Sequence, residues 1–170
     1  IYNYPELRQE LSAMGYTFFS HGDTEVILKA YHAWGEKALE RFNGMFAFAI
    51  HERETGTVFL ARDRLGIKPL YLAETPDGLA FASSLPALLS HGNVDTTLDP
   101  VALNYYLTFH SIVPAPRTLL AGVQKLPPAS WLRVTADGQR TQQQYWRVGF
   151  GTPAEWAGWS EAQWMEKTLE

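Results

Sequence analysis

The sequence contains no cysteine, and this absence excludes several kinds of chemistry. A chain without thiols forms no disulfide, offers no thiolate to a metal and supplies no cysteine nucleophile. It also has no apolar run near the roughly 20 residues that a membrane-spanning helix needs, so we expect no membrane partner. These absences together favour a cytoplasmic protein whose own residues carry no thiol chemistry.

Positive charge is also scarce. The chain has 14 Lys and Arg against 18 Asp and Glu, for a net charge of -4. The cations form no basic stripe, so nucleic acid is not an expected partner. The five histidines are scattered, without the i, i+4 spacing of a helical metal pair, and we expect no metal site.

Nucleotide-binding and hydrolase signatures are missing as well. The sequence has neither a G-x-G-x-x-G nor a Walker-type loop, and Ser83 and Ser84 lack the glycines of a nucleophile elbow. The first residue is Ile1, with no initiator methionine and no basic leader. We therefore expect an internal piece of a longer protein, with no catalytic residue identifiable from spacing.

The first 42 residues carry apolar side chains every three to four positions, as amphipathic helices do. A proline near the start of the first predicted helix and glycines after the apolar stretches are typical of helix boundaries. The elements predicted here are a helix from Asn3 to Gly15, a short strand from Tyr16 to Ser20, a helix from Asp23 to Trp34, and one or two helical turns between Glu36 and Phe42.

From Met45 the pattern changes to short apolar runs separated by turn residues, which predicts antiparallel strands. The run Phe46 to Ile50 is apolar on both faces, so layers are expected on both sides of its sheet; helix cover and a second sheet are not distinguished. The predicted strands are Met45 to Ile50, Val58 to Ala61, Leu70 to Ala73 and Leu79 to Ala82. We predict a layered α+β fold.

The composition changes after about Leu89. Two polar or glycine-rich stretches are predicted to be linkers, and the segments that contain proline are predicted to be loops. The elements predicted in this part are a linker over 90–97, a helix from Asp99-Pro100 to Phe109, a hairpin of Trp131 to Val134 with Gln144 to Arg147, a linker over 149–159, and a helix capped by Ser160.

Two places are candidate functional sites. Asp23 follows Gly22 at a helix start; local evidence favours an N-cap, and the same carboxylate could also bind an ammonium ligand. The second place is the charged run Arg62 to Pro69, for which local evidence favours a salt-bridged turn with Gly66 at positive φ.

Four motifs, in this order, resemble the class II glutamine amidotransferase domain of the asparagine synthetase family. They are Ile1 to Arg8, Gly22 to Ile27, Gly44 to Ile50 and Ala61 to Tyr71. The resemblance extends over about residues 1–147. Within the family, the tract Phe109 to Arg117 and the sequence Ser83-Ser84-Leu85-Pro86 most resemble N-acetylglutaminylglutamine amidotransferases, which amidate a dipeptide. Ser84 and Ala129 depart from ordinary asparagine synthetases, in which aspartate is the acceptor.

The resemblance implies an N-terminal-nucleophile (Ntn) αββα sandwich, of which this chain would be the C-terminal half. The nucleophilic cysteine and the Asn-Gly of the oxyanion hole would then precede Ile1, so the piece alone should be inert. The implied division is residues 1–90 for the back of the glutaminase domain, 91–159 for a connecting segment, and 160–170 for the start of a synthetase domain.

The resemblance also implies roles for individual residues and ligands. Asp23, with Gly22 beside it, would bind the α-ammonium of L-glutamine, and Met45 would line an ammonia tunnel, although an ordinary core methionine is equally compatible. Arg62, Asp63, Gly66 and Lys68 would shape a turn near a domain interface. ATP, Mg²⁺ and the acceptor carboxylate would bind beyond Glu170. A homodimer is left open, as is a non-catalytic binding or assembly module.

Overall fold

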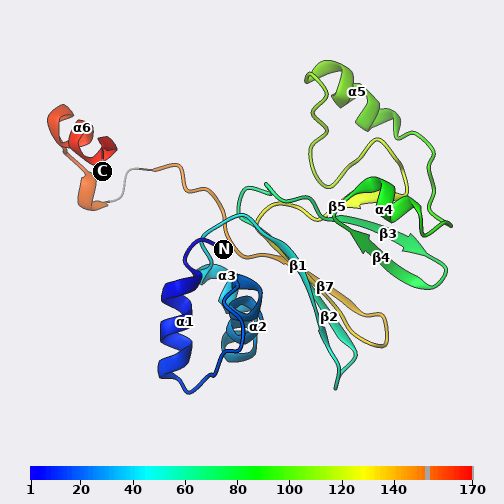
Figure 1. The fold of residues 1–170 in the computed structure, drawn as a ribbon. Coiled ribbons are helices and arrows are strands. Elements are labelled where there is room, and N and C mark those ends of the chain that lie inside the picture. Colours follow the sequence, from blue (N-terminus) through cyan, green and yellow to red (C-terminus); the bar gives the residue numbers. More distant parts are fainter. Residues whose placement is uncertain (152–153, 170) are drawn as a thin grey trace.

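The computed structural model describes residues 1–151 and 154–169, and its centre is a pair of antiparallel sheets. One sheet has four strands in the order β1-β2-β6-β7, and the other has three in the order β4-β3-β5. Helices α1 to α3 lie against one side of the larger sheet, and the smaller sheet lies on its other side (Figure 1). The predicted α+β fold is confirmed.

The helices and strands have the following bounds. The helical elements are α1 (Tyr4–Ala13), α2 (Asp23–Trp34), η1 (Gly35–Lys37), α3 (Ala38–Arg41), α4 (Leu85–Leu89), α5 (Pro100–Thr108), η2 (Ala154–Trp156) and α6 (Glu161–Leu169). The strands are β1 (Ala47–Glu52), β2 (Thr57–Arg62), β3 (Tyr71–Thr75), β4 (Gly78–Ala82), β5 (Val123–Lys125), β6 (Ser130–Val134) and β7 (Arg140–Gln144).

The larger sheet separates two apolar cores because alternate side chains of a strand point to opposite faces. On β2, Phe59 and Ala61 face the helices, whereas Leu60 faces the smaller sheet. The helix-side core includes Leu11, Val26, Leu39, Phe42 and Trp131. The core between the sheets includes Leu70, Leu72, Leu126 and Leu132.

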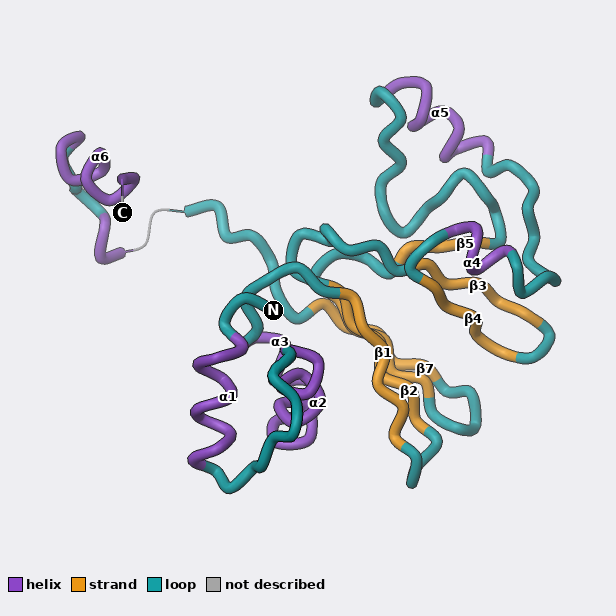
Figure 2. The backbone as a smooth tube through the Cα atoms, viewed as in Figure 1, coloured by secondary structure: helices purple, strands orange, loops and turns teal. Residues whose placement is uncertain are grey.

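A third apolar cluster covers the outer side of the smaller sheet. Ala73 of β3 and Val123 of β5 pack there with Leu88 of α4. The order of layers is therefore helices, sheet, sheet and helix, and the tube view shows this succession (Figure 2). In β1, Phe48 and Ile50 pack on the helix-side core and Ala47 packs on the core between the sheets, whereas Ala49 is exposed.

The segment Tyr16 to Ser20 is not a strand, contrary to the prediction. Its aromatic residues resemble a strand in sequence, but its backbone N–H groups have a different partner. Those of Phe19 and Ser20 donate to the side chain of Glu25 rather than to a neighbouring strand. The segment is therefore a loop fixed by tertiary contacts.

The last hairpin forms, but its second strand lies earlier than predicted. β7 pairs with β6 from Arg140, opposite Val134, to Gln144, opposite Ser130. All five residues of β7 are polar and exposed, so this edge strand lacks the apolar alternation on which the prediction depended. In the predicted linker over 149–159, Thr152 and Pro153 lie outside the described residues.

Each sheet contains strands that precede residue 90 in the sequence and strands that follow it. β2 pairs with β6, and β3 pairs with β5. A division at residue 90 therefore does not coincide with a break in either sheet, and residues 123–144 complete the same layers as residues 47–82. None of the helices within the described ranges has the length and apolar character required to cross a membrane.

Candidate functional site

A cavity of about 560 Å³ opens between the start of α2 and strand β1. Its wall is mostly apolar, and it also includes one acidic residue, Asp23, and two basic residues, His51 and Lys68. The lining residues are Ile1, Asp23, Thr24, Ile27, Leu28, Met45, Phe46, Ala47, Phe48, Ala49, Ile50, His51, Lys68, Pro69 and Ser83. A concave apolar site with a few polar groups is the usual form of a small-molecule site.

Asp23 is the first residue of α2, and its carboxylate does not cap the helix. The N-cap is Gly22, with φ -83° and ψ 164°, and no side chain caps this end. The N-cap hypothesis for Asp23 is therefore wrong. Its side chain, 43% exposed, forms an ion pair with the backbone nitrogen of Ile1. Most of the hydrogen-bonding capacity of this carboxylate remains open to the cavity.

Gly22 is outside the set of residues that line the cavity. A Cβ added there would meet no atom within 4 Å, and the φ angle is one that any residue adopts. Neither the backbone conformation nor crowding within the described chain thus requires a glycine at this position.

Met45 lies between two cavities. Besides the cavity at α2, it lines a second one of about 440 Å³ that also includes Tyr2, Arg64, Leu65 and Trp146. Its side chain is 42% exposed, so it is not an ordinary core methionine. The thioether is a flexible, apolar wall between the two spaces.

Asp63 is the centre of the charged turn that follows β2. The residue is only 1% exposed. Its carboxylate accepts backbone N–H groups of Ile67 and Lys68 at 2.9 Å, and of Phe46 and Leu65 at 3.2 Å. A buried carboxylate is compensated here by backbone donors.

Arg62 supports the same turn from its other side. The guanidinium donates to the backbone carbonyls of Lys68, Leu126 and Gly66 at 2.6 to 2.7 Å. Burial lowers the pKa of Arg62, and the charge of Asp63 acts against this shift. No ion pair joins the side chains of this turn in the described part of the chain, so hydrogen bonds to the backbone hold it rather than the predicted salt bridges.

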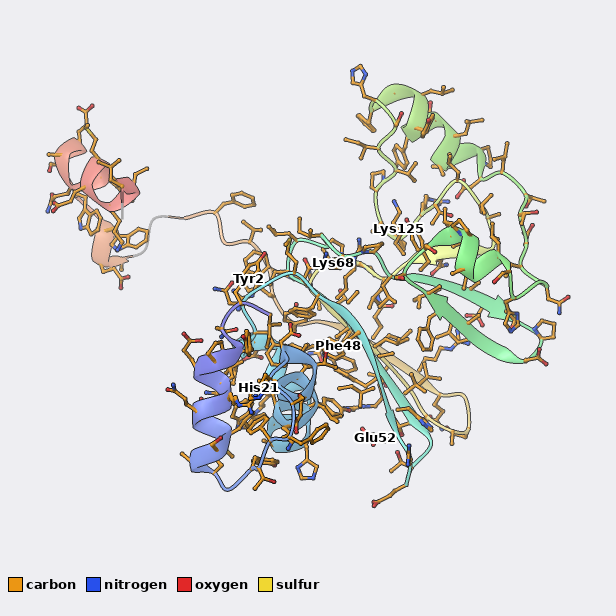
Figure 3. The ribbon with its side chains drawn as sticks, viewed as in Figure 1. Tyr2, His21, Phe48, Glu52, Lys68 and Lys125 are labelled. Atoms are coloured by element: carbon orange, nitrogen blue, oxygen red, sulfur yellow. The ribbon has the colours of Figure 1, made fainter. Side chains whose placement is uncertain are left out.

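Of the charged residues of this turn, Lys68 lines the cavity that Asp23 also lines. Its backbone is fixed by Arg62 and Asp63. Figure 3 shows Lys68 where the chain leaves the larger sheet, and Phe48 between β1 and the helices. Arg62, Asp63 and Gly66 stay outside this cavity, so of the charged turn only Lys68 and Pro69 line it.

Glu25 is the residue that the sequence interpretation missed. It is 6% exposed, and it accepts hydrogen bonds from the loop before α2. Burial would raise the pKa of this carboxyl, but hydrogen bonds from Lys29, Ser20 and Phe19 outweigh burial and lower the pKa from 4.5 to about 2. The signal in the sequence was an acid two residues after Asp23, in the first helical turn.

Metal ligation finds no support in these residues. Across residues 1–151 and 154–169, no group of three or more His, Asp or Glu side chains is arranged to hold a metal ion. The Mg²⁺ that the resemblance implies would bind beyond Glu170, outside these residues.

Comparisons with known proteins give a consistent result. A family model described as a glutamine amidotransferase domain matches residues 1–146. Asparagine synthetase [glutamine-hydrolyzing] 1 of Bacillus subtilis is 43% identical over 150 residues, covering 88% of this chain and 23% of that protein. Asparagine synthetase [glutamine-hydrolyzing] 3 of the same species is 32% identical over 148 residues, covering 87% of this chain and 24% of that protein.

A solved structure supports the fold. Glutamine phosphoribosylpyrophosphate amidotransferase from B. subtilis superposes with a TM-score of 0.57 at 19% identity, covering 86% of this chain and 27% of that chain. At this identity the likeness shows a shared fold. The chain spans about a quarter of the length of the curated relatives described above.

Proposed function

Because the chain belongs to the glutamine amidotransferase domain family, we propose that its cavity at α2 binds L-glutamine within an enzyme that transfers the amide nitrogen to a carboxyl group. The relatives are named as glutamine-hydrolysing asparagine synthetases, which supports glutamine as the amido donor. The nucleophile would come from outside these residues, since the chain has no cysteine, and the chain alone is expected to be inert.

The observation that carries this proposal is the position of the Asp23 carboxylate on the cavity wall, where its side chain is 43% exposed. A carboxylate forms its strongest hydrogen bonds with charged donors such as an ammonium group. In the structure this carboxylate pairs with the nitrogen of Ile1. If residues precede Ile1, this nitrogen is a peptide N–H, and the negative charge of Asp23 is left for a ligand.

Met45 is proposed to line the route of the released ammonia. It contributes to both the cavity at α2 and the second cavity, and its side chain offers no hydrogen bond that would retain a polar molecule strongly. An apolar wall also favours neutral ammonia over ammonium, because a charge is costly to desolvate. Gly22 would allow the backbone to approach the ligand near Asp23.

Two acceptors are proposed for the nitrogen. The tract Phe109 to Arg117 supports an N-acetylglutaminylglutamine-type dipeptide, whereas the names of the relatives favour aspartate. Product analysis of the full-length protein, supplied in turn with each acceptor, glutamine and ATP, distinguishes the two. ATP, Mg²⁺ and a homodimer belong to the same proposal and rest on the resemblance, and a cytoplasmic location is proposed with them.

The test is Asp23→Ala in the full-length protein, with Asp77→Ala as a control in an exposed turn. A hydrogen bond to a charged group contributes about 1.5–3 kcal/mol, so the KM for glutamine should rise roughly 10- to 150-fold. Activity with free ammonia should stay unchanged in both variants. Equal loss of the glutamine-dependent and ammonia-dependent activities would contradict a role in glutamine binding.

We propose as an alternative a non-catalytic Ntn module that binds a ligand or assembles with a partner. The full-length protein would then bind glutamine without releasing glutamate. Measuring glutamate release together with glutamine binding, by calorimetry, separates this candidate from the enzyme.

A further inference from the structure

The buried carboxylate of Glu25 organises the loop that leads to Asp23. It accepts the backbone N–H of Ser20 at 2.8 Å, the hydroxyl of Ser20 at 2.7 Å and the backbone N–H of Phe19 at 3.2 Å. Lys29, one helical turn later, pairs with the same carboxylate at 2.8 Å. Glu25 thus gathers donors from the loop and from its own helix.

Two cations fix the loop from its other sides. Arg8 of α1 donates to the carbonyl of Ser20 at 2.6 Å. Arg8 and Lys29 each lie 4.5 Å from the centre of the Phe18 ring. The loop, in which Figure 3 shows His21 beside the helices, is therefore attached to both α1 and α2.

This arrangement determines how the chain enters α2. The side chain at the N-cap of a helix usually accepts backbone N–H groups of the first turn. Here Glu25, in the first turn, accepts donors from Phe19 and Ser20, and Asp23 caps nothing. The carboxylate of Asp23 lines the cavity and pairs with the nitrogen of Ile1 rather than with its own helix.

We propose that Glu25 is a positioning residue for ligand recognition by Asp23. Glu25 is outside the cavity lining and does not touch a ligand there. It acts by fixing the loop 18–22 and hence the direction of the first residue of α2. This inference rests on the proposed function, because it assumes that Asp23 binds the α-ammonium of glutamine.

The first experiment is Glu25→Gln in the full-length protein. The amide keeps the volume, but it loses the charge and points an NH2 group at backbone donors. We expect the KM for glutamine to rise about tenfold, equivalent to about 1.4 kcal/mol, while kcat at saturating glutamine and ammonia-dependent activity change less than about twofold. A parallel fall in kcat at saturating glutamine and in ammonia-dependent activity, with the KM for glutamine unchanged, would show a purely structural role and overturn the proposal.

A double-mutant cycle with Asp23→Ala tests whether Glu25 acts through Asp23. In the Asp23→Ala background, Glu25→Gln should raise the KM no further. Effects that multiply would overturn the proposal. If Asp23→Ala leaves the KM unchanged, the proposed function fails; if Asp23→Ala raises it and Glu25→Gln does not, this inference alone fails.

Two further variants complete the experiment. Glu10→Gln is the matched control, since Glu10 pairs with Arg41 on the exposed side of α1, and its KM should equal that of the wild type. Ser20→Ala removes one donor to Glu25 and is the milder change if Glu25→Gln does not fold. Its KM for glutamine should rise about threefold with kcat unchanged, and no rise would contradict the proposal.

Discussion

The backbone N–H of Phe46 donates to the buried carboxylate of Asp63 at 3.2 Å, and the carbonyl of Phe46 accepts the N–H of Asp63 at 2.9 Å. These two hydrogen bonds tie the segment before β1 to the turn after β2. Met45 precedes Phe46, and Lys68 ends the turn that Asp63 holds, so one buried side chain fixes two parts of the cavity wall.

Asp63→Asn should therefore destabilise the whole fold. The amide loses the charge and directs an NH2 group at backbone N–H donors, which leaves buried groups without partners. We expect the free energy of unfolding to fall by about 3 kcal/mol, measured by urea denaturation. Asp77→Asn, in an exposed turn, should change it by less than about 0.5 kcal/mol. Similar values for the two variants would contradict the role of Asp63.

Gly66→Ala should also destabilise the protein, for two separate reasons. Gly66 has φ +67°, and an added Cβ would lie 2.9 Å from Pro128 Cγ and 3.1 Å from Arg62 Cζ. Gly138 has φ +82° with nothing within 4 Å, so Gly138→Ala isolates the backbone effect. We expect a loss of about 1 kcal/mol for Gly138→Ala and at least about 2 kcal/mol for Gly66→Ala in thermal unfolding. Equal losses would exclude the steric contribution.

The pH dependence of stability should contain a contribution from Glu25. Its pKa in the folded state is about 2, below the ordinary value of 4.5, because hydrogen bonds to the charged form outweigh burial. A lowered folded-state pKa means that the carboxylate contributes fully above about pH 4.5 and that this contribution is lost as the pH falls toward 2.

Urea unfolding at a series of pH values between 4.5 and 2 measures this contribution. The stability of the wild type should decline more steeply over this interval than that of Glu25→Gln, which has no carboxyl to protonate at this position. Parallel curves for the two proteins would mean that Glu25 has similar surroundings in the folded and unfolded states.

Much of the fold could be predicted because its signals are local. The apolar spacing of α1 and α2, and the alternation and turns of β1 to β4, lie within short stretches of sequence. β7 was misplaced because its residues, Arg140 to Gln144, carry no apolar side chain. The segment from Tyr16 to Ser20 was mistaken for a strand because the partner of its backbone, Glu25, lies on the next helix.

The functional site was harder to predict from the sequence than the fold was. Asp23 was selected from a motif, but only the folded chain brings Met45 and Lys68 to the same cavity. The N-cap hypothesis failed because Gly22 is the N-cap and Asp23 is already the first helical residue, with no cap hydrogen bond from its side chain. The path of the preceding loop, which brings Phe19 and Ser20 to Glu25, is likewise not specified by local spacing.

The pairing of β2 with β6 and of β3 with β5 has a consequence for synthesis on the ribosome. The hairpins β1-β2 and β3-β4 emerge first, each with a strand edge whose native neighbour has not yet been translated. Exposed edges recruit other chains, so a pause in translation before residue 123 would leave the nascent protein prone to aggregation. Synonymous codons over residues 90–122 would then alter yield without altering any amino acid.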